Sequence, residues 1–260
     1  MKKAVFFDID GTLWNERMQI PQSTPDAVRA LRASGHYAFL CSGRSRANIR
    51  TPKLLEIGFD GMVAACGADI EFQGESIFQK LMSQEEVEHA LSVIGRHHIS
   101  AVLEGPKYVY AKEEEFAGDP FITLLRKELD KDMKSIDQTT VYEVNKMSAA
   151  TNGADIEAVR DELGDAFSVI VHNPKLIEIV PRGITKATGI QKLCGYLNIQ
   201  RENTYAFGDS PNDLEMLEYV AHGIAMGNAG AAVRQAADYV TTDIMDDGIR
   251  NGLKYYGLIG

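Results

Sequence analysis

The sequence is short of cysteine and of long apolar runs. It holds three cysteines, Cys41, Cys66 and Cys194, and their spacing matches no metal-ligand pattern. No apolar run approaches the ~18 residues of a membrane-spanning helix. The first residues, MKKAVFFDIDGT, turn acidic too soon for a signal peptide. We therefore expect a cytoplasmic protein with reduced thiols and no membrane partner.

Basic residues are fewer than acidic ones, 27 against 37, and the formal net charge is -10 at pH 7. The sequence has no basic run and no basic–aromatic stripe, so it disfavours a nucleic-acid partner. An acidic chain can still bind an anion through a local device, such as a metal ion, a lysine or a helix N-terminus. A site for an anionic ligand would therefore depend on a few specific residues.

Both ends of the chain alternate short apolar runs with helical patterns. The segment STPDAVRALRASG, for example, offers Ser23 or Thr24 as an N-cap, Pro25 near the first turn and Gly35 as a stop. This alternation predicts a parallel sheet with crossover helices. The expected strands are 4–7, 37–43, 61–68, 204–210, 222–228 and 238–243, and the expected helices are 23–35, 213–221 and 229–237.

The middle of the chain has a different pattern. The segment SQEEVEHALSVIGRHH, residues 83–98, begins with the capping-box pair Ser83 and Glu86. Further helices are expected near 120–131 and at 154–164, and adjacent strand patterns favour an antiparallel sheet. We predict an α/β fold with a Rossmann-like parallel-sheet core, residues 1–79 plus 183–260, and an inserted α+β domain at 80–182.

Three acidic residues directly follow predicted strands. Asp8 and Asp10 come after AVFF, and Asp209 comes after TYAFG. In parallel α/β sheets, ligands bind at the carboxyl ends of the strands, where the strand order switches direction. Acids that converge there would repel one another unless a hard cation such as Mg²⁺ lay between them. Asp213 could belong to the same group or could only cap the helix that begins after Ser210 and Pro211.

Two further segments could hold a phosphate group. Ser42 and Gly43 follow the second strand and offer a hydroxyl group and an unobstructed backbone N–H, although Ser-Gly is also a common turn. Lys186 lies where a short loop leads into a predicted helix. It could reach the edge of the sheet, or it could be an ordinary solvated surface lysine.

The motifs DIDGT, SGR, Lys186 and GDSPND, in this order, resemble the four motifs of the haloacid dehalogenase superfamily. The insertion between the second and third motifs resembles the C2B-type cap of the Cof-type, or type IIB, sugar phosphatases. The resemblance implies a Mg²⁺-dependent phosphatase of small phosphorylated metabolites, which in this subclass are sugar phosphates. It also implies that the inserted domain closes over the substrate and sets specificity.

The resemblance further implies a role for each motif residue. Asp8 would be the nucleophile that forms an aspartyl-phosphate, and Asp10 the general acid and then the general base. Mg²⁺ would be held by the Asp8 carboxylate, the Asp10 backbone carbonyl and Asp209, so we expect the first strand to end near Asp8. The remaining roles are phosphate binding by Ser42, Gly43, Lys186 and Asn212, and support of the metal shell by Asp213.

Other functions stay open at this point. A phosphomutase of the same subclass would pass the phosphoryl group between two hydroxyls of one sugar. A receiver-like signalling module would use Asp8 as a long-lived phospho-acceptor but would not need an inserted lid, and a sugar-phosphate sensor would lack turnover. Polar cap residues that could contact the substrate include Lys146, Asn152 and Asn173. The sequence does not indicate the oligomeric state.

Overall fold

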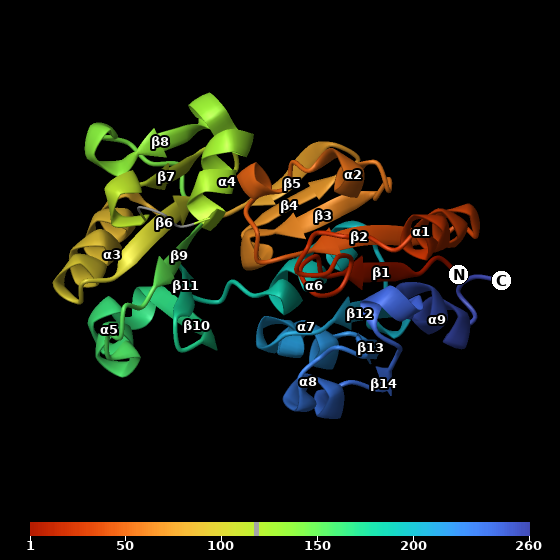
Figure 1. Ribbon diagram of the computed structural model, residues 1–260. Coiled ribbons are helices and arrows are strands. Elements are labelled where there is room, and N and C mark those ends of the chain that lie inside the picture. The colour runs from red at the N-terminus through yellow and green to blue at the C-terminus, as the bar shows by residue number, and fades with distance from the viewer. Residues whose placement is uncertain (117–119) are drawn as a thin grey trace. The chain divides into compact units, whose positions relative to one another are not determined.

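The computed structural model describes residues 1–116 and 120–260, and its contacts divide the chain into two compact units (Figure 1). The sequence-based borders, 79/80 and 182/183, can be compared with these units. The segment Arg44–Arg50, which we had placed in the core, groups with the inserted unit instead. Unit 1 comprises Met1–Gly43, Thr51–Phe78 and Thr185–Gly260, and unit 2 comprises Arg44–Arg50 and Gln79–Ile184.

The main sheet is eight-stranded, in the order β14-β13-β12-β1-β2-β3-β4-β5. From β14 to β3 each strand runs parallel to its neighbour, which confirms the predicted parallel core. Strand β4 pairs antiparallel with β3, and neither β4 nor β5 was predicted. The bounds are β1 Ala4–Phe7, β2 Tyr37–Cys41, β3 Gly61–Ala64, β4 Asp69–Phe72, β5 Glu75–Gln79, β12 Thr204–Gly208, β13 His222–Ala225 and β14 Tyr239–Val240.

Helices cover both faces of this sheet, which is why β1 is buried along its whole length. Phe6 packs in a cluster with residues of α6, α7 and α8. Phe7 points to the opposite face of the sheet and stacks on Phe207. Helix α9 contacts Phe207 and helix α1 contacts α9, so these two helices cover that face. The bounds are α1 Ser23–Ala33, α2 Pro52–Leu55, α6 Lys186–Tyr196, α7 Leu214–Tyr219, α8 Ala231–Ala236 and α9 Gly248–Tyr255.

Two of the predicted helix starts can be compared with the structure. Helix α3 begins after Ser83, and Ser83 and Glu86 form the expected capping box. The prediction for α1 was wrong in detail, because Gln22 occupies the N-cap position and makes no side-chain cap hydrogen bond. Ser23 and Thr24 lie within the helix, and Thr24 is buried there.

The sheet of unit 2 is six-stranded, in the order β10-β11-β9-β6-β7-β8. Its pairs are antiparallel as expected, except that β7 and β8 run parallel. The strands are β6 Ser100–Glu104, β7 Val109–Ala111, β8 Met133–Ser135, β9 Lys146–Ala150, β10 Phe167–Asn173 and β11 Leu176–Pro181, and the helices are α3 Gln84–Arg96, α4 Pro120–Leu129 and α5 Ile156–Leu163.

The two faces of the second sheet differ in chemistry. Alternate residues of β6, β9 and β11, such as Leu103, Met147 and Ile179, pack in an apolar cluster with α3 and α5. On the opposite face, α4 packs against Val102 and the strands β7 and β8. That face of β6, β9 and β11 also carries the polar side chains of Ser100, Glu104, Lys146, Ser148 and Glu178. Within the described residues, no helix is long and apolar enough to cross a membrane.

Candidate active site

Strands β1 and β12 are neighbours at the point where the strand order of the main sheet changes direction. From β1 the chain adds β2 and β3 on one side, and from β12 it adds β13 and β14 on the other. Phe7, the last residue of β1, pairs with Phe207 of β12, so Asp8 and Asp209 both follow strand ends at this edge. This is where open α/β sheets bind ligands, and the predicted acids lie there.

Asp8 is buried beside the end of β12. Its N–H donates to the Phe207 carbonyl at 3.0 Å, and its side chain lies beneath the surface. Burial and the nearby Asp213 carboxylate raise the pKa of Asp8 well above its usual value, although the Lys186 ammonium opposes this. The site therefore needs further positive charge if Asp8 is to act as an anion near neutral pH.

Lys186 is the first residue of α6 and is 2% exposed, so it is not a solvated surface lysine. Its ammonium nitrogen lies 2.6 Å from Asp8 Oδ1 and 2.6 Å from Asp213 Oδ1. Burial alone would lower its pKa, but the two carboxylates raise it well above the ordinary value. Lys186 is therefore a fixed positive charge inside the site.

Asp213 has two tasks, so the alternatives that the sequence left open do not exclude each other. Its Oδ2 atom accepts hydrogen bonds from the N–H groups of Asp209 at 2.9 Å and Ser210 at 3.0 Å. Its Oδ1 atom accepts from Lys186. One fully buried carboxylate thus closes the turn after β12 and orients the lysine.

Asp209 lies against the loop that follows β1. Thr12 Oγ1 donates to Asp209 Oδ1 at 2.8 Å. Gly11 has a φ of +88°, and a Cβ atom there would lie 2.1 Å from Asp209 Oδ2, so the approach requires glycine. Burial, with the Asp213 charge, raises the pKa of Asp209 to about 7. The structure thus brings a carboxylate next to Asp8 at an electrostatic cost.

Asp10 lies outside the regular strand, as expected, because β1 ends at Phe7. It forms an isolated bridge with Trp14, in which the Gly11 N–H donates to the Trp14 carbonyl at 3.0 Å. The Trp14 N–H donates to Ile9, so the Asp10 carbonyl is not an acceptor of this bridge. The Asp10 carboxyl group instead receives a hydrogen bond from the Trp14 indole at 2.8 Å.

The candidate phosphate-binding residues come from three elements. Ser42 and Gly43 follow β2, which is paired with β1, and the Ser42 side chain is buried. Asn212 lies in the turn Pro211–Asp213 and accepts a hydrogen bond from Ser210 Oγ at 2.5 Å. Their role as phosphate ligands stays a prediction.

Three carboxylates could act together as metal ligands. Asp8, Asp209 and Asp213 each offer an oxygen, and these oxygens lie within 4.8 Å of one another. Oxygen donors of this charge suit a hard divalent cation, which would also relieve the raised pKa values of Asp8 and Asp209. Lys186 and backbone N–H groups engage both oxygens of Asp213, so we expect Asp8 and Asp209 to be the direct ligands. Asp213 fits a supporting role.

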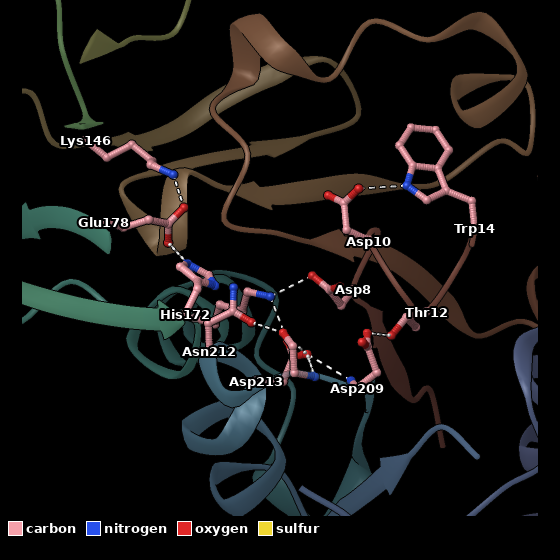
Figure 2. A network of polar contacts seen from close by, with 12 residues as sticks. Asp8, Asp10, Thr12, Trp14, Lys146, His172, Glu178, Asp209, Asn212 and Asp213 are labelled. Carbon is pink, nitrogen blue, oxygen red and sulfur yellow. Dashed lines mark hydrogen bonds and ion pairs between the residues drawn. The ribbon is translucent and has the colours of Figure 1, made fainter. Parts of the chain in front are cut away.

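Unit 2 holds a separate cluster of buried and half-buried polar side chains on one face of its sheet. Lys146 lies opposite Glu104 in the register of β9 and β6, with 3.4 Å between Nζ and Oε1. It also bonds Glu178, its diagonal neighbour on β11 (Figure 2). His172 Nε2 lies 2.9 Å from Glu178 Oε2, and Ser148 donates to Glu104. We call these five residues the Lys146 cluster.

The other two polar residues singled out in this unit lie in a turn and at the end of a strand. Asn152 has a φ of +52° and donates to the His98 carbonyl at 3.0 Å. Asn173 Oδ1 accepts from the Lys175 N–H at 2.8 Å. Both side chains are therefore engaged in local structure, and Lys146 remains the candidate of the three.

Sequence reasoning missed three residues that shape the site. Thr12 bonds Asp209, Trp14 bonds Asp10, and the Asn228 amide donates to the Gly11 carbonyl at 2.8 Å. The Gly-Thr pair after the two acids pointed to a functional loop, but it did not indicate which acid Thr12 would bond. Nothing in the sequence linked Asn228, 217 positions away, to Gly11.

Residues 5–253 match the family model of the haloacid dehalogenase-like hydrolases. The chain belongs to this family. It is 30% identical over 259 residues to YkrA of Bacillus subtilis (strain 168), covering 99% of this chain and 98% of the relative. The 5-amino-6-(5-phospho-D-ribitylamino)uracil phosphatase YitU of the same organism is 27% identical over 275 residues, with 97% and 96% covered.

Solved structures of the family have the same fold. A subclass IIB sugar phosphatase is 30% identical, has a TM-score of 0.83, and aligns over 99% of this chain and 100% of its own. A member of a phosphoryl-transfer superfamily is 29% identical, with a TM-score of 0.84 and both chains fully covered. The chain is accordingly a hydrolase of phosphoric monoesters within this family.

Proposed function

We propose that the protein is a Mg²⁺-dependent phosphatase that hydrolyses small phosphorylated metabolites, in particular sugar phosphates, through an aspartyl-phosphate on Asp8. The observation that supports this most strongly is the pairing of Asp8 with Lys186 at the switch point of the sheet. A buried carboxylate held by a buried ammonium group, beside a second acid, suits attack on a dianionic phosphate.

In the first step, an Asp8 oxygen would form a bond to phosphorus while the bond from phosphorus to the substrate oxygen breaks. Lys186 lies close enough to Asp8 to offset the negative charge of both reactants. The Asp8 carboxylate, the Asp10 carbonyl and Asp209 would hold the cation, and Ser42, Gly43 and Asn212 would join Lys186 around the phosphate. A bound cation supplies positive charge that screens the repulsion between carboxylate and phosphate.

Asp10 would then supply the proton chemistry. An alkoxide is a poor leaving group without a proton, and a positioned acid typically contributes about 10²–10⁴-fold to the rate. Asp10 would donate its proton to the leaving oxygen and afterwards take a proton from the water that hydrolyses the aspartyl-phosphate. Asp10 is exposed, which fits a group that exchanges protons with the leaving group and with water, whereas Asp8 is buried, which fits a group that attacks phosphorus.

We further propose that the leaving group is neutral and bears hydroxyl groups, which the composition of the Lys146 cluster would suit. It combines one ammonium group with two carboxylates, formally one negative charge in excess, beside a histidine and a serine. Such a set can donate to and accept from hydroxyl groups but would repel a second phosphate. We propose that unit 2 is the cap that contacts the non-phosphate part of the substrate. A hydroxyl-bearing substrate is in keeping with the names of the sugar phosphatase and the ribitylamino-uracil phosphatase among the relatives.

We also propose that the protein is located in the cytoplasm. Cys41, Cys66 and Cys194 are free and buried. Thiols kept reduced are typical of the cytoplasm, where small sugar phosphates are also found.

The experiment is a phosphate-release screen over sugar phosphates, sugar bisphosphates, nucleotides and 4-nitrophenyl phosphate, with Mg²⁺ or with chelator. We expect turnover of sugar monophosphates that the chelator abolishes. An isomerised sugar phosphate without free phosphate would indicate a phosphomutase. A stable phosphoprotein without turnover would indicate a signalling module, and either result would refute the proposal.

A further inference from the structure

Trp14 contacts the carboxyl group of Asp10. Its indole Nε1–H donates a hydrogen bond to Asp10 Oδ1 at 2.8 Å (Figure 2). The Trp14 side chain is 2% exposed, whereas Asp10 is an exposed residue. A buried and rigid ring therefore holds one oxygen of an exposed carboxyl group.

The chain between the two residues is a closed turn. The Ile9 carbonyl accepts from the N–H of Leu13 at 3.0 Å and from that of Trp14 at 3.3 Å. Ile9 and Leu13 are fully buried, and they anchor the turn in the core of unit 1. The backbone and the packing thus determine where the indole lies, so the ring does not depend on Asp10 for its position.

The torsion that turns an aspartate carboxyl group is broad, so the groups that bond the carboxyl oxygens decide its orientation. Proton transfer requires the donor to lie within hydrogen-bond reach of the leaving oxygen. A hydrogen bond from a fixed ring restricts the carboxyl group to the orientations that keep Oδ1 beside the indole.

We propose that Trp14 is a positioning residue for Asp10, an inference that rests on the proposed phosphatase function. The indole N–H can only donate, so Asp10 Oδ1 accepts from it, and we assign the transferable proton to Oδ2. In the first step the bond from phosphorus to the leaving oxygen breaks, and that oxygen takes the electron pair and the Oδ2 proton while Asp8 bonds to phosphorus. Oδ2 then takes a proton from water as the water oxygen bonds to phosphorus and the Asp8–phosphorus bond breaks.

The hydrogen bond serves both forms of Asp10. After the first step the group is a carboxylate, and a hydrogen bond from the indole to a charged oxygen is stronger than one to a neutral oxygen. Trp14 would thus hold the acid before proton donation and stabilise the base that forms afterwards. A ring that is only a core residue would contribute to folding and would not distinguish between substrates.

Substrates with different leaving groups distinguish a positioning role of Trp14 from a purely structural one. An alkyl phosphate needs a proton on its leaving oxygen, whereas 4-nitrophenolate leaves readily without one. Trp14→Phe keeps an aromatic ring but lacks the N–H. We expect kcat/KM for the alkyl phosphate to fall about 10- to 10²-fold, as for loss of a hydrogen bond to a charged group, and that for 4-nitrophenyl phosphate to fall less than ~3-fold.

Asp10→Asn is the reference for this pattern. It should impair the alkyl phosphate far more than the aryl phosphate, and adding Trp14→Phe to Asp10→Asn should cause little further loss. Equal losses on both substrates in Trp14→Phe, or no loss on the alkyl phosphate, would overturn the positioning role. If Asp10→Asn itself has no selective effect, the proposed function of Asp10 fails instead, so the two failures are distinguishable.

Trp14 is the single tryptophan of the chain, which allows an isosteric test if Trp14→Phe does not fold. Biosynthetic replacement of tryptophan by 3-benzothienylalanine exchanges the indole N–H for sulfur with nearly unchanged shape. We expect the same selective loss on alkyl phosphates. Unchanged kinetics in this protein would also contradict the proposal.

Discussion

The ammonium nitrogen of Lys186 lies 2.6 Å from a carboxylate oxygen of Asp8, although 178 positions separate the two residues in the sequence. The contact forms because Asp8 directly follows the central strand β1 and Lys186 begins a helix packed against the same sheet. Both side chains are buried, so water screens the interaction little. The pair therefore combines a nucleophile with the charge that would make its attack on phosphate feasible.

Lys186→Met should reduce kcat by about 10²–10³-fold, the range found when a preorganised charge or donor is removed from a transition state. Methionine preserves much of the length of the side chain but leaves Asp8 and Asp213 without the ammonium group. Lys192→Met is the matched control, because Lys192 lies exposed on the same helix. Steady-state kinetics of both variants provide the test. An equal loss of kcat in the two variants, or no loss in Lys186→Met, would contradict the proposed role of the Asp8–Lys186 pair.

Gly11→Ala should abolish most activity, because its Cβ atom would collide with the Asp209 carboxylate. Gly35→Ala is a stringent control. Gly35 has a similar φ of +84° but no heavy atom within 4 Å of the added Cβ. Both changes should destabilise the fold by about 1–2 kcal/mol through the left-handed backbone. We expect similar melting temperatures for the two variants and a large difference in activity; similar activities would show that the Gly11–Asp209 approach is unimportant.

The metal-free protein should lose stability as the pH rises from about 4 to 7. Burial raises the pKa of Asp209 from 3.8 to about 7, so the folded state keeps a proton that the unfolded chain has released in this window. When the native state binds more protons, the free energy of unfolding falls with rising pH. Thermal unfolding in chelator across this range measures the slope, and Asp209→Asn should flatten it.

Added Mg²⁺ should reverse this trend. The cation competes with the proton on Asp209, so its stabilising effect should be small near pH 5 and largest above pH 7. A rise of the melting temperature with Mg²⁺ that is equal at pH 5 and pH 8 would contradict the assignment of Asp209 as a ligand. So would an undiminished effect in Asp209→Asn.

Lys146→Met should destabilise the protein by about 3–5 kcal/mol, because it leaves two buried carboxylates without their shared partner. Although burial alone would raise the pKa of Glu178, Lys146 and His172 hold it below its usual value, so this group is charged at neutral pH. Adding Glu178→Gln to Lys146→Met should restore part of the loss. Urea unfolding measures the free energy of unfolding of these variants and of the control Lys127→Met, in which an exposed lysine of α4 is replaced. An equal loss of stability in Lys146→Met and Lys127→Met would argue against a coupled cluster.

The parallel part of the main sheet could be predicted because its strands are short apolar runs bounded by helix signals. β4 and β5 were missed because most of their residues are only partly buried or exposed, so DIEF and ESIFQ give no apolar run. The mixed sheet of unit 2 was predicted as antiparallel, and the parallel pair β7–β8 was not, since strand direction depends on the path of the chain between them. The grouping of Arg44–Arg50 with unit 2 likewise depends on packing, such as that of Ala47.

The acids of the site could be proposed from their places after strands, but their partners could not. The bonds from Thr12 to Asp209 and from Trp14 to Asp10 depend on how the loop after β1 folds back. The burial of Lys186 depends on the docking of α6. Sequence patterns report which residues follow a strand, whereas these contacts arise from side-chain directions in three dimensions.

The covalent role of Asp8 is tested most directly by quenching the enzyme in acid during turnover of a substrate from the phosphate-release screen and analysing its peptides by mass spectrometry. The account predicts one phosphoryl group on the peptide that contains Asp8. Asp8→Asn should show neither the adduct nor turnover while remaining folded. Turnover by Asp8→Asn at the wild-type rate, or an adduct on another residue, would contradict it.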